Sequence, residues 1–286
     1  MAHPAQTQYA LAATQTGKPT RPRPGSPHRS RLGRPLWSWL ILRPPQRCAV
    51  TDKTVAFVLY PGLTPLDLIG PLQVMSALEA VEEMFGVEPR HHVVVVAEEI
   101  DAVPTDTPVR VAATSILDDV PEPDVVVVPG GGAPTLRQLA NPVLLDYLRQ
   151  VDRRAELVGS VCTGALLLAG AGLLEGTSRH NTHWAYHRFL DRSGATYVPE
   201  RWVEDDRYLT CAGVSAGIDM ALRLAARLTN DDLARMVQLG IEYDPHPPNG
   251  GIDWTGVDRD MLAARVEGFA NDALADHPTM LARLLG

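Results

Sequence analysis

Short apolar runs alternate with longer segments of helical periodicity over most of the chain. The runs predict buried strands at 55–60, 91–97, 109–113, 124–128 and 157–161. Apolar residues at helical spacing predict helices at 68–85, 134–154, 163–174, 184–190, 216–228 and 231–243. Two further segments are expected to pair as strands around a turn at 204–206, namely 196–203 and 207–211.

Strands that are apolar throughout and alternate with helices are typical of a parallel sheet covered on both faces. We therefore predict a doubly wound α/β domain with a mostly parallel sheet over residues 52–250. Residues 251–286 are expected to form a helical extension packed on this domain. Sites in such folds lie at the carboxyl ends of strands. Polar residues or glycines follow the apolar run at three such ends: 60–67, 128–132 and 161–163.

Cys162 stands where the apolar run 157–161 meets the helical segment that begins at Thr163. Only a tight turn joins a strand to a helix in so few residues, and it would hold the sulfur at a helix N-terminus. A thiol held there tends to have a lowered pKa and to exist partly as thiolate. The pattern predicts a cysteine form of the nucleophile elbow, with a space-filling buried cysteine as the alternative.

The other two strand ends carry candidate partners for the thiol. Asp67 is either the N-cap of the next helix or a carboxyl group that reaches the thiol, with a pKa raised by apolar surroundings. Gly130, Gly131 and Gly132 form an oxyanion hole, a phosphate cradle or a simple tight turn. The stretch lacks the endings of a P-loop and the spacing of a dinucleotide fingerprint.

Three histidines occur within eight residues, at His180, His183 and His187. The last two have the spacing of metal ligands on a helix, but no third ligand is obvious, so we predict no metal. His183, with Trp184 beside it, is instead a candidate pocket residue and a base or hydrogen-bond partner of the thiol. The alternative is that these residues belong to a helix start or to the surface. Ser215 lines the pocket or caps the helix that follows it.

Composition and charge narrow the function further. The chain has 286 residues and a net charge of −8. The first 50 residues carry eight Lys/Arg and no acid, so the rest of the chain has 18 basic and 34 acidic residues. The excess of acidic residues after position 50 argues against nucleic-acid binding. The Pro- and Arg-rich residues 1–51 are expected to be a disordered tail, with a targeting segment or an upstream start as alternatives. No apolar run reaches 18 residues, and three cysteines without disulfide or zinc spacing suggest a reducing, cytoplasmic setting without a membrane span.

Seven short motifs follow one another in the predicted domain: Leu66–Pro71, Pro129–Gly131, Ser160–Gly164, Ala171–Leu174, Thr182–His187, Ala216–Asp219 and Val237–Tyr243. In order and spacing they resemble the ThiJ/PfpI superfamily, which is similar to class I glutamine amidotransferases. Within it, the likeness is to the isonitrile (isocyanide) hydratases. Most of the superfamily carries Glu where this chain has Asp67, and the hydratase-like branch carries Asp.

The resemblance implies a flavodoxin-like fold and a homodimer that acts on a small molecule without cofactor or metal. It also implies a nucleophilic Cys162, an acidic partner at Asp67, and backbone N–H groups near Gly131 and Thr163 that flank the thiol. In the implied reaction the thiolate attacks the isonitrile carbon and gives a thioimidate-like adduct. Asp67 supplies a proton and then helps to activate water, which releases an N-formamide.

Other functions stay open. One is a different activity of the superfamily, such as that of a glyoxalase, a deglycase or a peptidase-like hydrolase. Another is a sensor, either a redox-sensing thiol or a ligand-binding domain related to AraC-type regulators. Only 36 residues follow Gly250, acidic on balance, too few for a pair of DNA-binding helix-turn-helix motifs. Residues 175–182 are slightly longer than the likeness predicts, with His180 and Asn181 in place of small residues, which leaves the substrate open.

Overall fold

The computed structural model describes residues 52–174, 176 and 178–286, so the predicted tail at 1–51 lies outside the described residues. The strands are β1 (Lys53–Val58), β2 (His91–Ala97), β3 (Val103–Pro104), β4 (Arg110–Val111), β5 (Ser115–Ile116), β6 (Val125–Val128), β7 (Leu157–Ser160), β8 (Arg179–His180), β9 (Thr196–Tyr197), β10 (Trp202–Asp205) and β11 (Tyr208–Cys211). The helices are α1 (Pro65–Phe85), α2 (Ala133–Gln138), α3 (Pro142–Asp152), α4 (Gly164–Gly170), α5 (His187–Arg192), α6 (Ala216–Leu228), α7 (Asp231–Gly240), α8 (Ala263–Ala273) and α9 (Pro278–Leu285), with short 3₁₀ turns η2 (Leu117–Asp119) and η3 (Trp184–Tyr186).

A seven-stranded sheet forms the centre of the domain, in the order β10-β11-β7-β6-β1-β2-β5. All neighbouring strands run parallel except β10, which pairs antiparallel with β11 at one edge. All four valines of β6 are buried, as expected of a central strand that has helices over both faces. The predicted fold class, a mostly parallel α/β sheet with helices, is confirmed.

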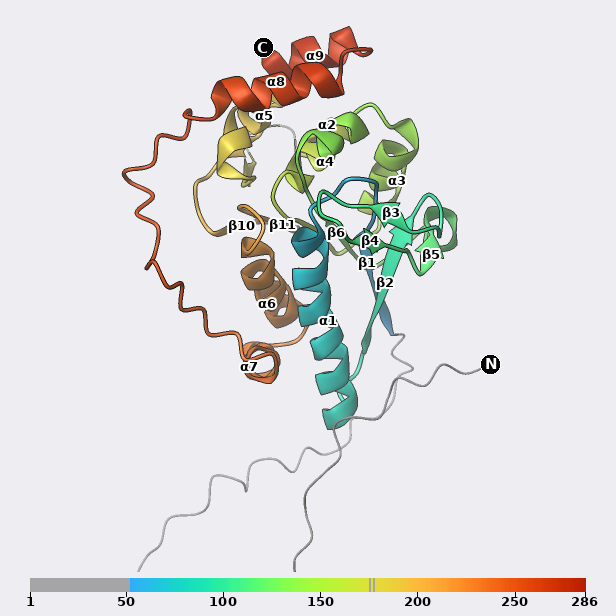
Figure 1. Cartoon of the computed structure of the whole chain (residues 1–286). Helices are drawn as coiled ribbons and strands as arrows, with labels where there is room; N and C mark the ends of the chain where they lie inside the picture. Colours follow the sequence, from blue (N-terminus) through green and yellow to red (C-terminus); the bar gives the residue numbers. More distant parts are fainter. Residues whose placement is uncertain (1–51, 175, 177) are drawn as a thin grey trace, which may run out of the picture. The chain divides into compact units, whose positions relative to one another are not determined.

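The helices fall into two groups that contact the sheet. Helices α1, α6 and α7 pack on one another, and Figure 1 shows α1 and α6 side by side. In the second group α4 contacts α2, α3 and α5, while α8 packs on α2 and α9 on α5. Residues 241–262, between α7 and α8, contain neither helix nor strand. Within the described part of the chain, no helix is long and apolar enough to cross a bilayer.

Several element boundaries differ from those that periodicity predicts. The helix expected at 134–154 is two helices, because the Asn141 side chain accepts the N–H groups of Val143 (3.1 Å) and Leu144 (3.3 Å) and Pro142 begins a new helix. The helix expected at 163–174 ends at Gly170. The strand expected at 196–203 is two short strands, of which only β10 joins the main sheet.

The strand ends are held together by close backbone contacts that only glycine permits. A Cβ on Gly164 would lie 2.1 Å from the carbonyl oxygen of Val128, and one on Gly130 would lie 2.5 Å from the nitrogen of Thr163. Contacts this short exclude any side chain. The start of α4 is therefore pressed against the end of β6, and the residues between β7 and α4 are brought to the same edge of the sheet.

Candidate active site

Cys162 lies in the turn between β7 and α4, with a left-handed φ of 56°. Its side chain is buried, with 4% exposed. Its N–H donates to the carbonyl oxygen of Ala212 (3.2 Å), and its own carbonyl oxygen accepts the hydroxyl proton of Thr182 (3.0 Å). A left-handed non-glycine residue is strained, and the flanking hydrogen bonds keep it in place. The thiol therefore has a fixed direction.

Burial raises the pKa of the Cys162 thiol well above its usual value, and the negative charge of Asp67 adds to this effect. The backbone N–H groups of Val214 and Thr163 face the sulfur and act in the opposite direction. The sequence predicts a lowered pKa from the helix N-terminus. The structure gives the opposite direction, because desolvation outweighs those two donors. The resting sulfur therefore carries its proton.

Asp67 lies in the first turn of α1, whose N-cap is Thr64, so the N-cap alternative for Asp67 is wrong. The side chain is fully buried. Its Oδ2 accepts the N–H of Gly130 (3.0 Å), and its Oδ1 has no hydrogen-bond partner among the described residues. Burial raises the pKa of Asp67 to about 7, while the N–H of Gly130 and the nearby Cys162 thiol act to lower it. The carboxyl group can thus exchange a proton near neutral pH beside the thiol.

The glycine-rich turn at 130–132 is joined to the residue after Cys162 by two hydrogen bonds of the Thr163 hydroxyl. The hydroxyl of Thr163 donates to the carbonyl oxygen of Gly131 (2.6 Å) and accepts the N–H of Gly131 (2.8 Å). The N–H that the resemblance assigns to the thiol is therefore already bonded to Thr163. Gly132, half-buried, precedes α2.

Val214 lies beside the thiol, although the sequence does not single it out as a candidate site residue. It is a β-branched residue with a positive φ of 37°, and its N–H faces the sulfur. The only signal in the sequence is its position beside Gly213, between a strand and a helix. A β-branched residue gives no local reason to expect a left-handed backbone.

His183 packs against the loop that carries Val214. A Cβ on Gly213 would lie 2.5 Å from the His183 ring. Nδ1 of His183 accepts the N–H of Ala185 (3.2 Å), so the neutral ring carries its proton on Nε2. Burial lowers the pKa of His183 and keeps the ring neutral. The ring stacks on Trp184 (5.6 Å between centroids), so both predicted pocket residues lie beside this loop.

Tyr186 meets the His183 ring edge-on, with 5.8 Å between centroids. Burial, with the charge of Cys162 second, raises the pKa of Tyr186 to about 12. Its hydroxyl group therefore remains protonated near the thiol at neutral pH.

The remaining predicted residues make contacts with other groups. His187 pairs with Asp260 (3.5 Å), and His180 is buried against Tyr208, with 5.7 Å between ring centroids. Ser215 stands at the N-cap position of α6 without a capping hydrogen bond, and its hydroxyl accepts from Arg201 (3.2 Å). Among residues 52–286 as described, no three His, Cys, Asp or Glu side chains are grouped to hold a metal. Glu175 and Thr177, in the segment of unusual length, lie outside the described residues.

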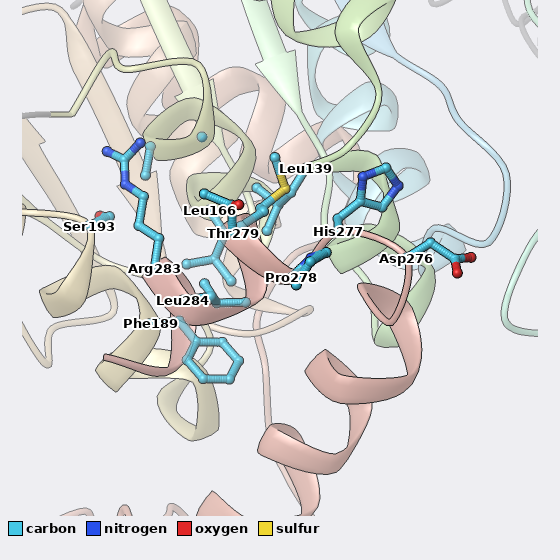
Figure 2. Close-up of a pocket in the computed structure, with 13 residues that line it drawn as sticks. Leu139, Leu166, Phe189, Ser193, Asp276, His277, Pro278, Thr279, Arg283 and Leu284 are labelled. Carbon is cyan, nitrogen blue, oxygen red and sulfur yellow. The ribbon is translucent and has the colours of Figure 1, made fainter.

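A separate cavity of about 530 Å³ lies between α4, α5 and α9. Its walls are mainly apolar, with Leu166, Phe189 and Leu284 among the lining residues. Figure 2 shows the charged ends of Arg283 and Asp276 on opposite sides of these apolar side chains. None of its lining residues belongs to the thiol site.

The fold and the site together define a class: α/β proteins with a buried cysteine on a strand–helix elbow, paired with a carboxyl group at the carboxyl edge of a parallel sheet. Residues 53–227 match the model of the DJ-1/PfpI family. The chain belongs to the DJ-1/PfpI family.

Individual relatives agree with this assignment. An isonitrile hydratase of Pseudomonas putida is 40% identical over 195 residues, which cover 68% of this chain and 80% of that protein. An HTH-type transcriptional regulator, CdhR of Pseudomonas aeruginosa, is 29% identical over 186 residues, 63% of this chain and 52% of the regulator. The crystal structure of a ThiJ/PfpI family protein from Pseudomonas syringae has a TM-score of 0.66 and 29% identity, and the match covers 83% of this chain and 92% of that one.

Proposed function

We propose that this protein is an enzyme that hydrates isonitriles to N-formamides, with Cys162 as nucleophile and Asp67 as proton donor and acceptor. The observation that carries the proposal is the buried Cys162–Asp67 pair in a chain 40% identical to an isonitrile hydratase. An aspartate whose pKa is about 7 can hold a proton and release it at neutral pH, as general acid–base chemistry requires.

The reaction begins when the sulfur attacks the terminal carbon of the isonitrile. The Asp67 carboxylate accepts the proton of the thiol as the S–C bond forms and then delivers this proton to the carbon, giving a thioimidate-like adduct. The pair thus loses one proton to the substrate, and Asp67 is again a carboxylate. The N–H groups of Val214 and Thr163 stabilise the thiolate as it forms.

Water completes the reaction. The Asp67 carboxylate accepts a proton from the water that attacks the adduct carbon and passes it to the nitrogen. The C–S bond then breaks, and the proton of the new hydroxyl group returns to the sulfur through Asp67. The products are an N-formamide and the free thiol, so the net change is the addition of one water to the isonitrile. No cofactor or metal takes part. The half-buried side chains of His183 and Trp184, with Gly132, form the substrate pocket beside the thiol.

The proposal includes a homodimer in the cytoplasm. Leu66 (44% exposed) and Ile69 (43% exposed) flank Asp67 on α1 and present apolar surface beside the site. A second copy would cover them. Light scattering is expected to give the mass of a dimer, and Leu66→Lys with Ile69→Lys is expected to give a monomer. A monomeric parent protein would remove this part of the proposal. Free thiols such as Cys162 stay reduced in the cytoplasm.

The test is formamide production from cyclohexyl isonitrile by the full chain. Cys162→Ala and Asp67→Asn are expected to lose turnover, while Cys211→Ala, a matched cysteine variant, keeps it. No formamide from folded parent protein would contradict the proposal and turn attention to glyoxal-type substrates. Turnover retained by Cys162→Ala would contradict the cysteine mechanism alone.

A further inference from the structure

A second thiol, that of Cys211, lies next to Cys162 at the same edge of the sheet. Strands β7 and β11 are parallel neighbours in the register Ser160 with Thr210. Cys211 is the next residue after Thr210 on β11, and Cys162 is the second residue after Ser160, just beyond the end of β7. The N–H of Cys162 donates to the carbonyl oxygen of Ala212 (3.2 Å), so the two backbones remain hydrogen-bonded where the cysteines lie.

The two sulfurs share one environment. Cys211 is completely buried and Cys162 nearly so, and neither forms a disulfide. The N–H of Cys162 also faces the Cys211 sulfur. Burial, and after it the charge of Asp67, raises the pKa of both thiols, so the same carboxyl group acts on both. Neighbouring strands are about 4.8 Å apart, and the two cysteines are offset by one residue, about 3.3 Å, along them. Their Cα atoms are therefore separated by roughly 6 Å, within the range that a disulfide spans.

We propose that Cys162 and Cys211 form a reversible intramolecular disulfide when the protein meets a hydroperoxide, with Cys211 as the resolving thiol. The Cys162 thiol passes its proton to the Asp67 carboxylate as its sulfur attacks one peroxide oxygen. The O–O bond breaks and the leaving oxygen takes this proton from Asp67, so that a sulfenic acid and one water (or alcohol) result. The Cys211 sulfur then attacks the sulfenic sulfur, the S–O bond breaks, and a second water leaves as the S–S bond forms. Two thiols lose two electrons, and one peroxide gains them.

Asp67 is placed to serve this reaction too. Resolution requires that Cys211 lose a proton, and the carboxylate of Asp67 is the nearby base. The disulfide would withdraw the nucleophile from any reaction that uses it, and reduction by a dithiol would restore it. It would also keep Cys162 from oxidation to the sulfinic acid, which dithiols do not reverse.

Peptide mapping tests the proposal without any isonitrile, so its failure and that of the proposed function are distinguishable. The full chain carrying Cys48→Ala is treated with hydrogen peroxide, alkylated in denaturant and digested with trypsin. The expected product joins residues 155–179 to 208–223, two hydrogens lighter than the sum of the reduced peptides, and disappears after dithiothreitol.

The resolving role is tested by Cys211→Ala in the same background, with Cys211→Val as a second variant in case the first does not fold. In either folded variant, peptide 155–179 is expected to gain two oxygens that dithiothreitol does not remove. Equal sulfinic acid yields in parent and variant, with peptide 208–223 always recovered alkylated, would overturn the proposal. A parent protein whose Cys162 resists excess peroxide would overturn it as well.

Discussion

The thiol site and the cavity beneath α9 differ in how tightly they are packed. At the thiol site Asp67 has no exposed surface, and a Cβ on Gly130 would meet backbone at 2.5 Å. Beneath α9 about 530 Å³ stays open between mainly apolar walls. The reactive groups gather where hydrogen bonds and close contacts fix their directions, which is what proton transfer to and from a sulfur requires. Free volume is therefore a poor guide to where this chain concentrates its chemistry.

The largest effect is expected from adding a methyl group to the closely packed backbone at the start of α4. Gly164→Ala would place a methyl group 2.1 Å from the Val128 carbonyl oxygen, and backbone cannot swing away as a side chain can. We expect the free energy of unfolding to fall by more than about 3 kcal/mol and the reactivity of Cys162 to change. Urea unfolding and thiol alkylation rates measure the two effects.

The matched control for this change is Gly268→Ala in α8, where an added Cβ meets nothing within 4 Å. It is expected to stabilise the protein by about 0.5–1 kcal/mol, because alanine favours helix. If both variants unfolded at the same urea concentration, close packing at the start of α4 would not matter for stability.

Thr163→Val removes both hydrogen bonds to Gly131 and keeps the shape of the side chain. It leaves a buried N–H and a buried carbonyl oxygen without partners, so we expect a loss of about 2–3 kcal/mol. Thr196→Val, at an exposed position in β9, is the comparison and is expected to change stability by less than about 0.5 kcal/mol. A small effect at Thr163 would mean that other groups hold the glycine-rich turn.

Asp67→Asn is expected to stabilise the protein at pH 8 by about 2 kcal/mol while it removes the proton carrier. The folded-state pKa of about 7 lies above the ordinary value of 3.8, so the buried charge destabilises the fold above neutral pH. The penalty shrinks as the pH falls through 7 and is absent below about 4, where the carboxyl group is protonated in both states.

Unfolding of Asp67→Asn and its parent at pH 8 and pH 5 measures this difference. The increase in the free energy of unfolding of Asp67→Asn over its parent is expected to be larger at pH 8 than at pH 5. Asp272→Asn, at an exposed position in α8, should show no such dependence. A gain that grew toward acid would contradict the assigned direction of the Asp67 pKa.

The smallest effect is expected at the cavity wall. Leu284→Ala widens a space that is already open, so we expect a loss of about 1 kcal/mol and unchanged formamide production. Leu167→Ala in α4, where the side chain is fully buried, is expected to cost about 3 kcal/mol. Equal losses at the two positions would show that α9 is packed as firmly as the core.

The sequence predicts this fold well because the buried strands are continuous apolar runs. The runs at β2 and β6 and the periodicity of α6 locate those elements almost to the residue. The break at Asn141 was also readable, since Asn before Pro is a helix start. Strand order was not readable beyond the fold class, because periodicity reports burial and not which strand pairs with which.

The candidate site was predictable in part. Cys162 and Asp67 stand out because each follows a strand end. The use of the Gly131 N–H by Thr163 was not predictable, since it depends on a contact between two loops. The direction of the Cys162 pKa depends on how completely the fold removes water, which a sequence pattern does not report. Val214 needs a left-handed backbone that its residue type does not suggest.

The groups around the sulfur come from segments far apart in the chain, and this bears on events during synthesis. Asp67 and Gly130 leave the ribosome before Cys162, whereas β11 and Val214 leave it some fifty residues later. Until β11 joins β7, the nascent thiol is an ordinary exposed cysteine, open to any electrophile in the cell. Docking of β11 both buries the thiol and brings the N–H of Val214 to it. The rate at which a thiol reagent labels ribosome-bound chains of increasing length would therefore report when that strand docks.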